Sequence, residues 1–289
     1  MTTLITALLL GSLTLLILVG ATGMGAMLLP AARVPAALAD GALVVADGPR
    51  TRLRRGLIVG VAAAFVLIAL AVLLRGLLAG RPPWSNLHEF SIAFATALLG
   101  TYLVLARTNQ IAGLAPFAAL LAAGLVGFAL GLDDRVDPLV PALQSPLLAI
   151  HVGAAALAYA VASVAFLTAA AELGQRATAD GIDLLPSAET ARAVGHRAVL
   201  IAFPILTIAI ALGSVWANLA WRSYWSNDPK ELAAAATWLV FGAYLHVAGR
   251  RDRWERLAPW LIVLGFAGVL FTYIGAGLFF IGEHSYAAP

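Results

Sequence analysis

The stretch G-L-I-V-G-V-A-A-A-F-V-L-I-A-L-A-V-L-L-R-G-L-L-A at Gly56–Ala79 contains a single charged side chain. A run of this length crosses the hydrocarbon core of a bilayer as one α-helix, because about 20 apolar residues are enough. The rest of the chain has the same character: 62% of its 289 residues are hydrophobic and 11% are charged, with a mean hydropathy of +0.93. Such a composition excludes an ordinary water-facing surface and indicates a polytopic membrane protein.

Eight apolar runs of near-spanning length follow one another along the chain. They are residues 4–29, 56–79, 90–106, 111–132, 146–171, 198–216, 232–249 and 259–281. The first run is preceded by no Lys or Arg and so lacks the basic segment of a cleavable signal peptide, which favours a permanent span. We therefore expect an all-α protein with about eight transmembrane helices, forming a single domain over residues 1–289.

The basic residues predict the orientation, because connections rich in Lys and Arg stay on the cytoplasmic side. Most of the 18 basic residues follow the first, third, fifth and seventh runs: Arg33, Arg50, Arg52, Arg54, Arg55, Arg107, Arg176, Arg192, Arg197, Arg250, Arg251, Arg253 and Arg256. The N-terminus and the C-terminus are then both expected on the extracytoplasmic side. The formal charge of +3 and the scatter of basic residues exclude nucleic acid as a partner. The chain contains no Cys, so any thiol chemistry belongs to a partner or a substrate.

The expected outer face carries a Trp-rich external loop at about residues 214–231, which reads W-A-N-L-A-W-R-S-Y-W-S-N-D-P-K-E at Trp216–Glu231. Trp and Tyr gather at membrane interfaces in any case. Here Trp216, Trp221, Tyr224 and Trp225 crowd one connection, which is denser than an interface belt needs. The loop therefore predicts a site for a flat, apolar ligand with anionic groups.

Three outer segments carry helix-start signals. In one of them Ser145 fits an N-cap and Pro146 the first helical position. Asp228 fits an N-cap, Pro229 the first helical position, and Glu231 the residue that reaches back to the cap, so local helix physics explains D-P-K-E without a ligand. Asn86 and Glu89 have the same spacing, and there a capping role and a ligand contact are equally favoured. On the cytoplasmic side, Ser187 fits the N-cap of a short amphipathic helix, although a solvated loop is the simpler interpretation.

Three of the five histidines lie where an imidazole is difficult to explain as filler, since an ionisable group in a span is by default a functional candidate. His151 lies six residues past Ser145, roughly 9 Å below the outer end of its helix, and His284 follows the last run at the same face. Together they suit axial ligation of a haem iron from both sides. His246 is expected in the inner half of the bilayer. His196, beside Arg197, is interpreted as a solvated residue.

The Trp216–Glu231 segment resembles the "WWD" signature of haem-handling proteins, in particular the CcsA/ResC-type proteins of System II cytochrome c biogenesis. Four further segments match in order along the chain: S-N-L-H-E at Ser85–Glu89, I-H-V at Ile150–Val152 with A-Y-A following, W-L at Trp238 with L-H at His246, and G-E-H-S-Y-A at Gly282–Ala287.

The resemblance implies a haem-handling subunit of a membrane cytochrome c synthase, in the bacterial cytoplasmic membrane or a thylakoid membrane, with its active site on the extracytoplasmic side. His151 and His284 would ligate the iron of haem b, which is the substrate and a transient ligand, while the Trp-rich loop packs the porphyrin. His246 would pair with a histidine of a ResB/CcsB-type membrane subunit. The reaction would join the haem vinyl groups to the thiols of a C-x-x-C-H apocytochrome c, which thiol-reducing proteins keep reduced.

Four positions depart from the family pattern. Asn227 stands where a Trp usually precedes Asp-Pro-Lys-Glu, Arg222 replaces a Gly, Ala233 replaces another Trp, and His88 stands where Tyr is common. Each lost ring weakens the aromatic platform by roughly 0.5–1.5 kcal/mol. As a hypothesis, Arg222 pairs with a haem propionate, because guanidinium binds carboxylate bidentately. Asp228 and Arg222 are therefore candidate haem contacts together with Trp216, Trp221, Tyr224 and Trp225.

Two other functions remain open from the residues alone. A membrane b-type cytochrome would keep a bis-His haem permanently for electron transfer. A non-haem transporter or structural subunit would use the Trp-rich loop only as an interface belt, with the histidines as polar core residues.

Overall fold

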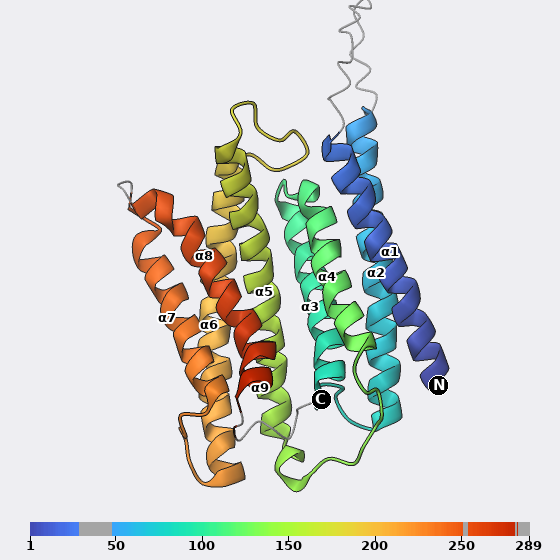
Figure 1. Ribbon diagram of the computed structural model, residues 1–289, viewed down its shortest axis with the longest axis vertical. Coiled ribbons are helices and arrows are strands. Elements are labelled where there is room, and N and C mark those ends of the chain that lie inside the picture. The colour runs from blue at the N-terminus through green and yellow to red at the C-terminus, as the bar shows by residue number, and fades with distance from the viewer. Residues whose placement is uncertain (29–47, 251–253, 281, 283–289) are drawn as a thin grey trace, which may run out of the picture.

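The computed structural model describes residues 1–28, 48–250, 254–280 and 282. Every regular element in these ranges is a helix, as Figure 1 shows. The long helices are α1 (Thr2–Leu28), α2 (Pro49–Ala79), α3 (Leu87–Thr108), α4 (Ala115–Leu130), α5 (Pro146–Ala177), α6 (Ala188–Trp221), α7 (Pro229–Val247) and α8 (Trp254–Leu270). The short ones are the 3-10 turns η1 (Ala112–Leu114) and η2 (Pro141–Leu143), the π-helical turn η3 (Phe271–Gly275) and α9 (Ala276–Phe279).

Among the described residues, seven helical stretches are long and apolar enough to cross a membrane. They are the helices α1, α2, α3, α5 and α6, the η1–α4 stretch and the stretch from Arg256 to Phe279. Helix α7 is not one of them, since the polar residues of its charged first turn and His246 near its end lower its apolar character. The expected all-α, multi-pass membrane protein is confirmed, while an eighth span at α7 stays a prediction.

The helices lie alongside one another, and their connections alternate between the two ends of the bundle (Figure 1). Residues 80–86, 131–145 and 222–228 lie at the lower end together with the N-terminus; we call this the Trp end because Trp84, Trp221 and Trp225 lie there. The upper end holds the connection at 178–187 and the start of α2 with Arg50; we call it the Arg end. Which end faces the cytoplasm stays a prediction from the charges.

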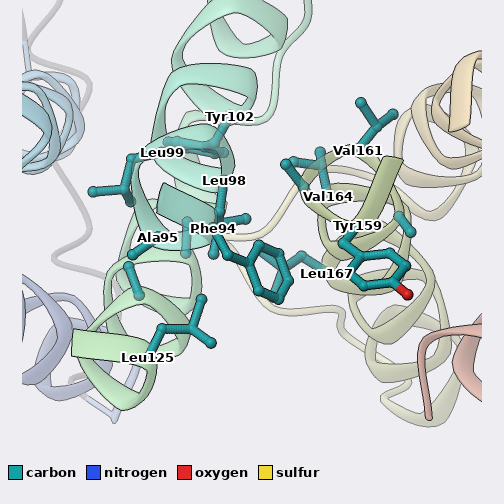
Figure 2. Packing of buried hydrophobic residues seen from close by; sticks show 14 of the residues in the cluster. Phe94, Ala95, Leu98, Leu99, Tyr102, Leu125, Tyr159, Val161, Val164 and Leu167 are labelled. Atoms are coloured by element: carbon teal, nitrogen blue, oxygen red, sulfur yellow. The ribbon is translucent and has the colours of Figure 1, made fainter. Parts of the chain in front are cut away.

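The core lies between α3, α4 and α5. Phe94 projects from α3 toward Tyr159 on α5, with the ring centroids 6.0 Å apart (Figure 2). Phe90 and Tyr273 extend this cluster, and Tyr273 brings η3 against α3 at a centroid distance of 5.3 Å from Phe90. Burying these rings stabilises the bundle by packing, because lipid tails are as apolar as the side chains and leave little hydrophobic drive.

Several helices extend beyond their apolar runs. Helix α6 begins at Ala188, ten residues before the predicted run, and the Ser187 side chain accepts a hydrogen bond from Thr190 N–H at 3.1 Å. The solvated-loop interpretation of this segment is therefore wrong from Ala188 onward. The helix continues because the capped backbone satisfies its own hydrogen bonds outside the hydrocarbon as well as inside it.

Candidate functional site

A cavity opens at the Trp end between α3, α5, α6, α7 and η3, with a volume of about 210 Å³. Most of its wall is apolar or aromatic. Four of the predicted site residues line it: His151, Trp216, Tyr224 and Trp225. The structure thus brings together one predicted iron ligand and three predicted porphyrin contacts from α5, α6 and the loop that follows α6.

His151 is half-buried on α5, and its ring lies against α6. Its Nδ1 lies 2.7 Å from the Ala209 carbonyl oxygen. A carbonyl only accepts, so Nδ1 carries the proton, and the neutral ring then has its in-plane lone pair on Nε2. Metal-ligating histidines usually have this arrangement, because the backbone partner fixes the tautomer and the ring orientation.

Gly213 makes room for this imidazole. A methyl group at Gly213 would lie 2.6 Å from His151 Cε1, closer than real contacts allow. A glycine is therefore required in this turn of α6 for His151 to reach the cavity wall.

The aromatic residues divide into a packed pair, in which Trp216 is buried and Trp221 half-buried, and an exposed pair. Trp216 is buried and meets Trp221 edge to face at a centroid distance of 4.9 Å. Trp221 does not line the cavity but packs against the ring of Trp216. Tyr224 and Trp225 are 59% and 41% exposed. They form the exposed part of the cavity wall.

The loop between α6 and α7 is shaped by two left-handed residues, Arg222 with φ 63° and Asn227 with φ 61°. Arg222 ends α6 in the conformation that Gly adopts most easily, which explains why the family pattern has Gly there. Asn tolerates this conformation better than most residues, and its Oδ1 accepts a 2.9 Å hydrogen bond from Trp225 Nε1. Arg222 is exposed and does not line the cavity, so its predicted propionate contact stays a hypothesis.

Asp228 acts as the predicted N-cap of α7. Its Oδ1 accepts from Lys230 N–H at 2.9 Å, and Glu231 Oε2 accepts from Asp228 N–H at 3.2 Å and from Ser226 N–H at 2.8 Å. Gly282 lies against the Asp228 carboxylate, since a methyl group there would come 2.2 Å from Oδ2. Gly282, which is two positions before His284 in the sequence, therefore lies at the Trp end. His284 itself lies outside the described residues.

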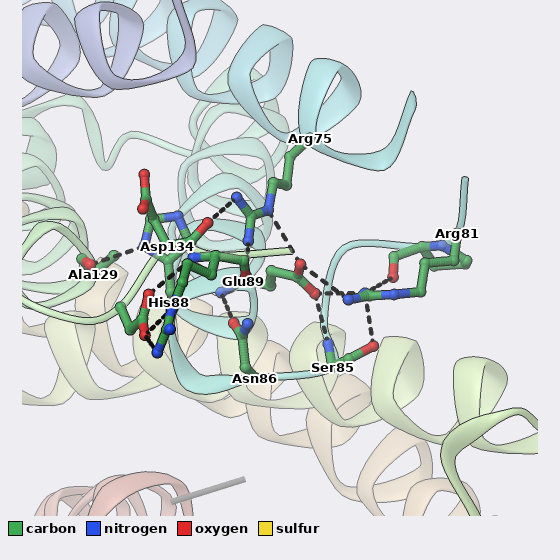
Figure 3. A network of polar contacts seen from close by, with 11 residues as sticks. Arg75, Arg81, Ser85, Asn86, His88, Glu89, Ala129 and Asp134 are labelled. Carbon is green, nitrogen blue, oxygen red and sulfur yellow. Dashed lines mark hydrogen bonds and ion pairs between the residues drawn. The ribbon is translucent and has the colours of Figure 1, made fainter. Parts of the chain in front are cut away.

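The start of α3 contains a buried ion network (Figure 3). The Glu89 carboxylate accepts from Arg75 Nε at 3.1 Å and from Arg81 Nη1 at 2.7 Å. It also accepts from Ser85 N–H at 3.0 Å, while Asn86 caps the helix as predicted by accepting from Glu89 N–H at 2.8 Å. These contacts fix the segment around Trp84, whose ring lies beside Gly153 on α5 and lines the cavity.

The third predicted ligand lies elsewhere. His246 is exposed in the last turn of α7, at the Arg end and far from the Trp-end cavity, and its expected depth in the bilayer stays a prediction. His196 is also at the Arg end but is half-buried, with Nδ1 3.3 Å from the Tyr244 hydroxyl. The interpretation of His196 as a solvated residue is therefore wrong, because Tyr244 on α7 packs over it.

Sequence reasoning missed several residues that line the cavity. Trp84 and Lys230 had weak signals, a Trp just before a span and the single Lys of the chain. Phe90, Tyr159 and Tyr273 form the apolar floor. Tyr273 belongs to the π-helical turn η3, and such turns often occur at functional sites.

The fold and the site define a class of protein: a multi-pass membrane protein in which a histidine lines an aromatic cavity. Residues 84–284 match the family described as cytochrome c assembly protein. The chain belongs to this family and to its CcsA type. Among its relatives, the cytochrome c biogenesis protein CcsA of Parasynechococcus marenigrum is 34% identical over 78% of this chain and 84% of that protein.

Two other relatives carry the same name. The CcsA protein of Microcystis aeruginosa is 34% identical over 78% of this chain and 86% of its own length. That of Chlamydomonas reinhardtii is 36% identical over 76% of this chain and 65% of its own length. A role in cytochrome c biogenesis follows from the family, and the resemblance inferred from the Trp-rich segment is confirmed.

Proposed function

We propose that this protein is the haem-handling subunit of a membrane cytochrome c synthase and presents haem b in the Trp-end cavity. The observation that carries the proposal is the seat of His151. Its Nδ1 donates to the Ala209 carbonyl, so the lone pair is on Nε2, the nitrogen through which this ring would bind iron, and the ring lies in a wall rich in aromatic side chains. A porphyrin is flat and apolar, so its two faces pack well against aromatic side chains, and its iron is commonly bound by an imidazole nitrogen.

The second axial ligand in this proposal is His284. The support is indirect, since Gly282 lies against Asp228 at the same end as the cavity. Two imidazoles from distant parts of the chain would hold the iron between them and fix the plane of the haem. Asp228 contributes by capping α7 and so by setting the position of the loop and of Gly282.

The reaction is the addition of each cysteine thiol of a C-x-x-C-H apocytochrome c across a haem vinyl group. The sulfur forms a bond to one vinyl carbon, the thiol proton goes to the other, and no electrons are gained or lost overall. The residues of this chain contribute by positioning, because holding the vinyl groups at an open rim removes the entropic cost of bringing thiol and vinyl together. Tyr224 and Trp225 form that exposed rim. Release follows when the histidine of the C-x-x-C-H segment replaces one axial ligand.

His246 supports a second role, as the ligand that receives haem on its way to the cavity. Its side chain is exposed on α7, where a histidine of a ResB/CcsB-type membrane subunit would reach it. In this proposal the Trp end faces away from the cytoplasm, in agreement with the basic residues gathered at the Arg end. Thiol-reducing proteins act indirectly, by keeping the apocytochrome thiols reduced.

The family favours this function over the two alternatives. A permanent b-type cytochrome would hold reducible haem without serving cytochrome c assembly, and a transporter or structural subunit would bind no haem. Neither explains a chain that belongs to the cytochrome c assembly family.

The test measures haem content and cytochrome c maturation with the full chain and its partner subunit co-expressed. We expect His151→Ala and His284→Ala each to lose haem and maturation, whereas the matched substitution His196→Ala at the Arg end retains both. Gly213→Ala should resemble His151→Ala, because its methyl group displaces the imidazole. Gly127→Ala, on an open face of α4, is the control for a helical glycine. Normal haem content and maturation in both histidine variants would reject the proposal.

A further inference from the structure

Lys230 is the single lysine of the chain and lies in the wall of the Trp-end cavity. It is in the first turn of α7, and its backbone N–H donates to the Asp228 cap. Its side chain crosses to α9, where a methyl group on Gly277 would lie 3.7 Å from Cε and 3.9 Å from Nζ. The ammonium group is thus held at the cavity by contacts from two helices.

Within the described part of the chain, the Lys230 ammonium takes part in no hydrogen bond or ion pair. Burial lowers the pKa of Lys230, and the charge of the nearby Asp228 opposes this shift without forming an ion pair. In the cap, Asp228 Oδ1 accepts the Lys230 N–H, and Glu231 Oε2 accepts two backbone N–H groups. By contrast, three of the four arginines described at the Trp end, Arg75, Arg81 and Arg135, each pair with a carboxylate.

A half-buried ammonium group beside an apolar wall is costly unless an anion accompanies it. The cavity therefore combines three requirements for its ligand: an atom that binds imidazole, a flat apolar body, and a negative group near Lys230. A metalloporphyrin with carboxylate side chains satisfies all three. The exposed Arg222 is outside the cavity and would compete with water for the same carboxylate.

We infer that Lys230 is a positioning residue that binds a propionate of the haem presented in this cavity; the inference rests on the proposed function. The two propionates occupy one edge of the haem, and the two vinyl groups lie toward the other side. His151 on α5 fixes the iron, and Lys230 on α7 fixes the rotation of the ring about the iron–nitrogen bond. Together they determine which edge of the haem faces the incoming thiols.

The experiment compares iron protoporphyrin IX with its dimethyl ester, in which both carboxylates are neutral. Each is titrated into the full-length protein in detergent, and binding is followed by absorption spectroscopy. A charge-assisted hydrogen bond contributes about 1.5–3 kcal/mol, so the wild type should bind the free acid about tenfold more tightly or better. Lys230→Met should remove this discrimination, and Lys230→Arg should keep most of it.

Arg135→Gln is the matched control, because it removes a positive charge at the same end from a side chain that is 76% exposed and outside the cavity. It should discriminate like the wild type. Equal discrimination in Lys230→Met and wild type, or none in the wild type, would overturn the assignment of Lys230. The proposed function is tested separately by His151→Ala, which should lose binding of both porphyrins. If it does so while Lys230→Met behaves like the wild type, the proposed function stands and only the assignment of Lys230 fails.

Discussion

The starts of α3 and α7 carry the same local signal and use it differently. In both, a capping residue is followed three positions later by Glu, and in both the capping side chain accepts a backbone hydrogen bond. Among the described residues, Glu231 accepts only from its own cap and loop, whereas Glu89 accepts from Ser85 N–H in its loop and also pairs with the guanidinium groups of Arg75 and Arg81. The spacing determines where a helix begins, and the tertiary neighbours determine what the glutamate does.

The difference has a functional consequence, because each helix start positions one residue of the cavity. The Glu89 network holds the segment of Trp84, and the cap of α7 holds Lys230. The first is a buried ionic structure at the junction of α2 and α3. The second is a helix start stabilised by local hydrogen bonds between the loop and the first turn of α7.

The largest effect is expected from breaking the network at α3. Glu89 is fully buried and Arg75 is 1% exposed, so Glu89→Leu leaves a buried arginine without its counter-ion at a cost of roughly 3–5 kcal/mol. The measurement is the loss of thermal stability of the detergent-solubilised protein. Asp133→Asn is the control, since the exposed Asp133–Arg135 pair contributes less than about 1 kcal/mol. Similar losses of thermal stability in both variants would show that the Glu89 network stabilises the fold no more than an exposed ion pair does.

A smaller effect is expected at α7. Glu231→Ala removes the acceptor for the N–H groups of Ser226 and Asp228, and the loss of such hydrogen bonds at a helix start costs about 1 kcal/mol. We expect the loop after Trp221 to become more accessible to limited proteolysis, with little change in the unfolding temperature. Glu189→Ala, in the first turn of α6, serves as a control. A loss as large as that of Glu89→Leu would remove the distinction between the two helix starts.

The smallest effect concerns the left-handed residues of the loop. Arg222→Gly should stabilise the protein by up to about 1 kcal/mol, because Gly adopts φ 63° without steric strain. Asn227→Gly should change stability by only a few tenths of a kcal/mol, since Asn already tolerates this conformation. Thermal unfolding of the two single variants makes the comparison. Destabilisation by Arg222→Gly would mean that the Arg222 side chain makes a contact whose stabilisation exceeds the cost of its left-handed backbone conformation.

The sequence predicted the class of fold well, because hydrophobic length is a direct physical requirement of a bilayer. Each of the eight predicted runs overlaps a helix of the structure, and the caps at Asn86, Ser187 and Asp228 accept the expected backbone hydrogen bonds. Ser145 also precedes its helix as expected, but its side chain makes no capping hydrogen bond. Helix ends were less predictable. Helix α6 extends back to Ala188 through polar residues, because a hydropathy profile detects the lipid-facing part of a helix and not its hydrogen bonding.

Part of the site was also predictable. His151 and Trp216 carry chemistry that is unusual within an apolar span, and both line the cavity. Lys230 was missed because the cap explains D-P-K-E completely at the local level, and the direction of its side chain depends on Gly277, 47 positions further along the chain. The seat of His151 likewise depends on Gly213, a contact between helices that no local pattern shows.

The most direct test of the account is the spin state of the ferric iron in haem bound to the purified protein, measured by electron paramagnetic resonance in wild type and His151→Ala. Two imidazole ligands give a low-spin iron. We predict a low-spin signal in wild type, and in His151→Ala a conversion to high spin of whatever haem is retained. An unchanged low-spin signal in His151→Ala would contradict the claim that this imidazole holds the iron in the Trp-end cavity.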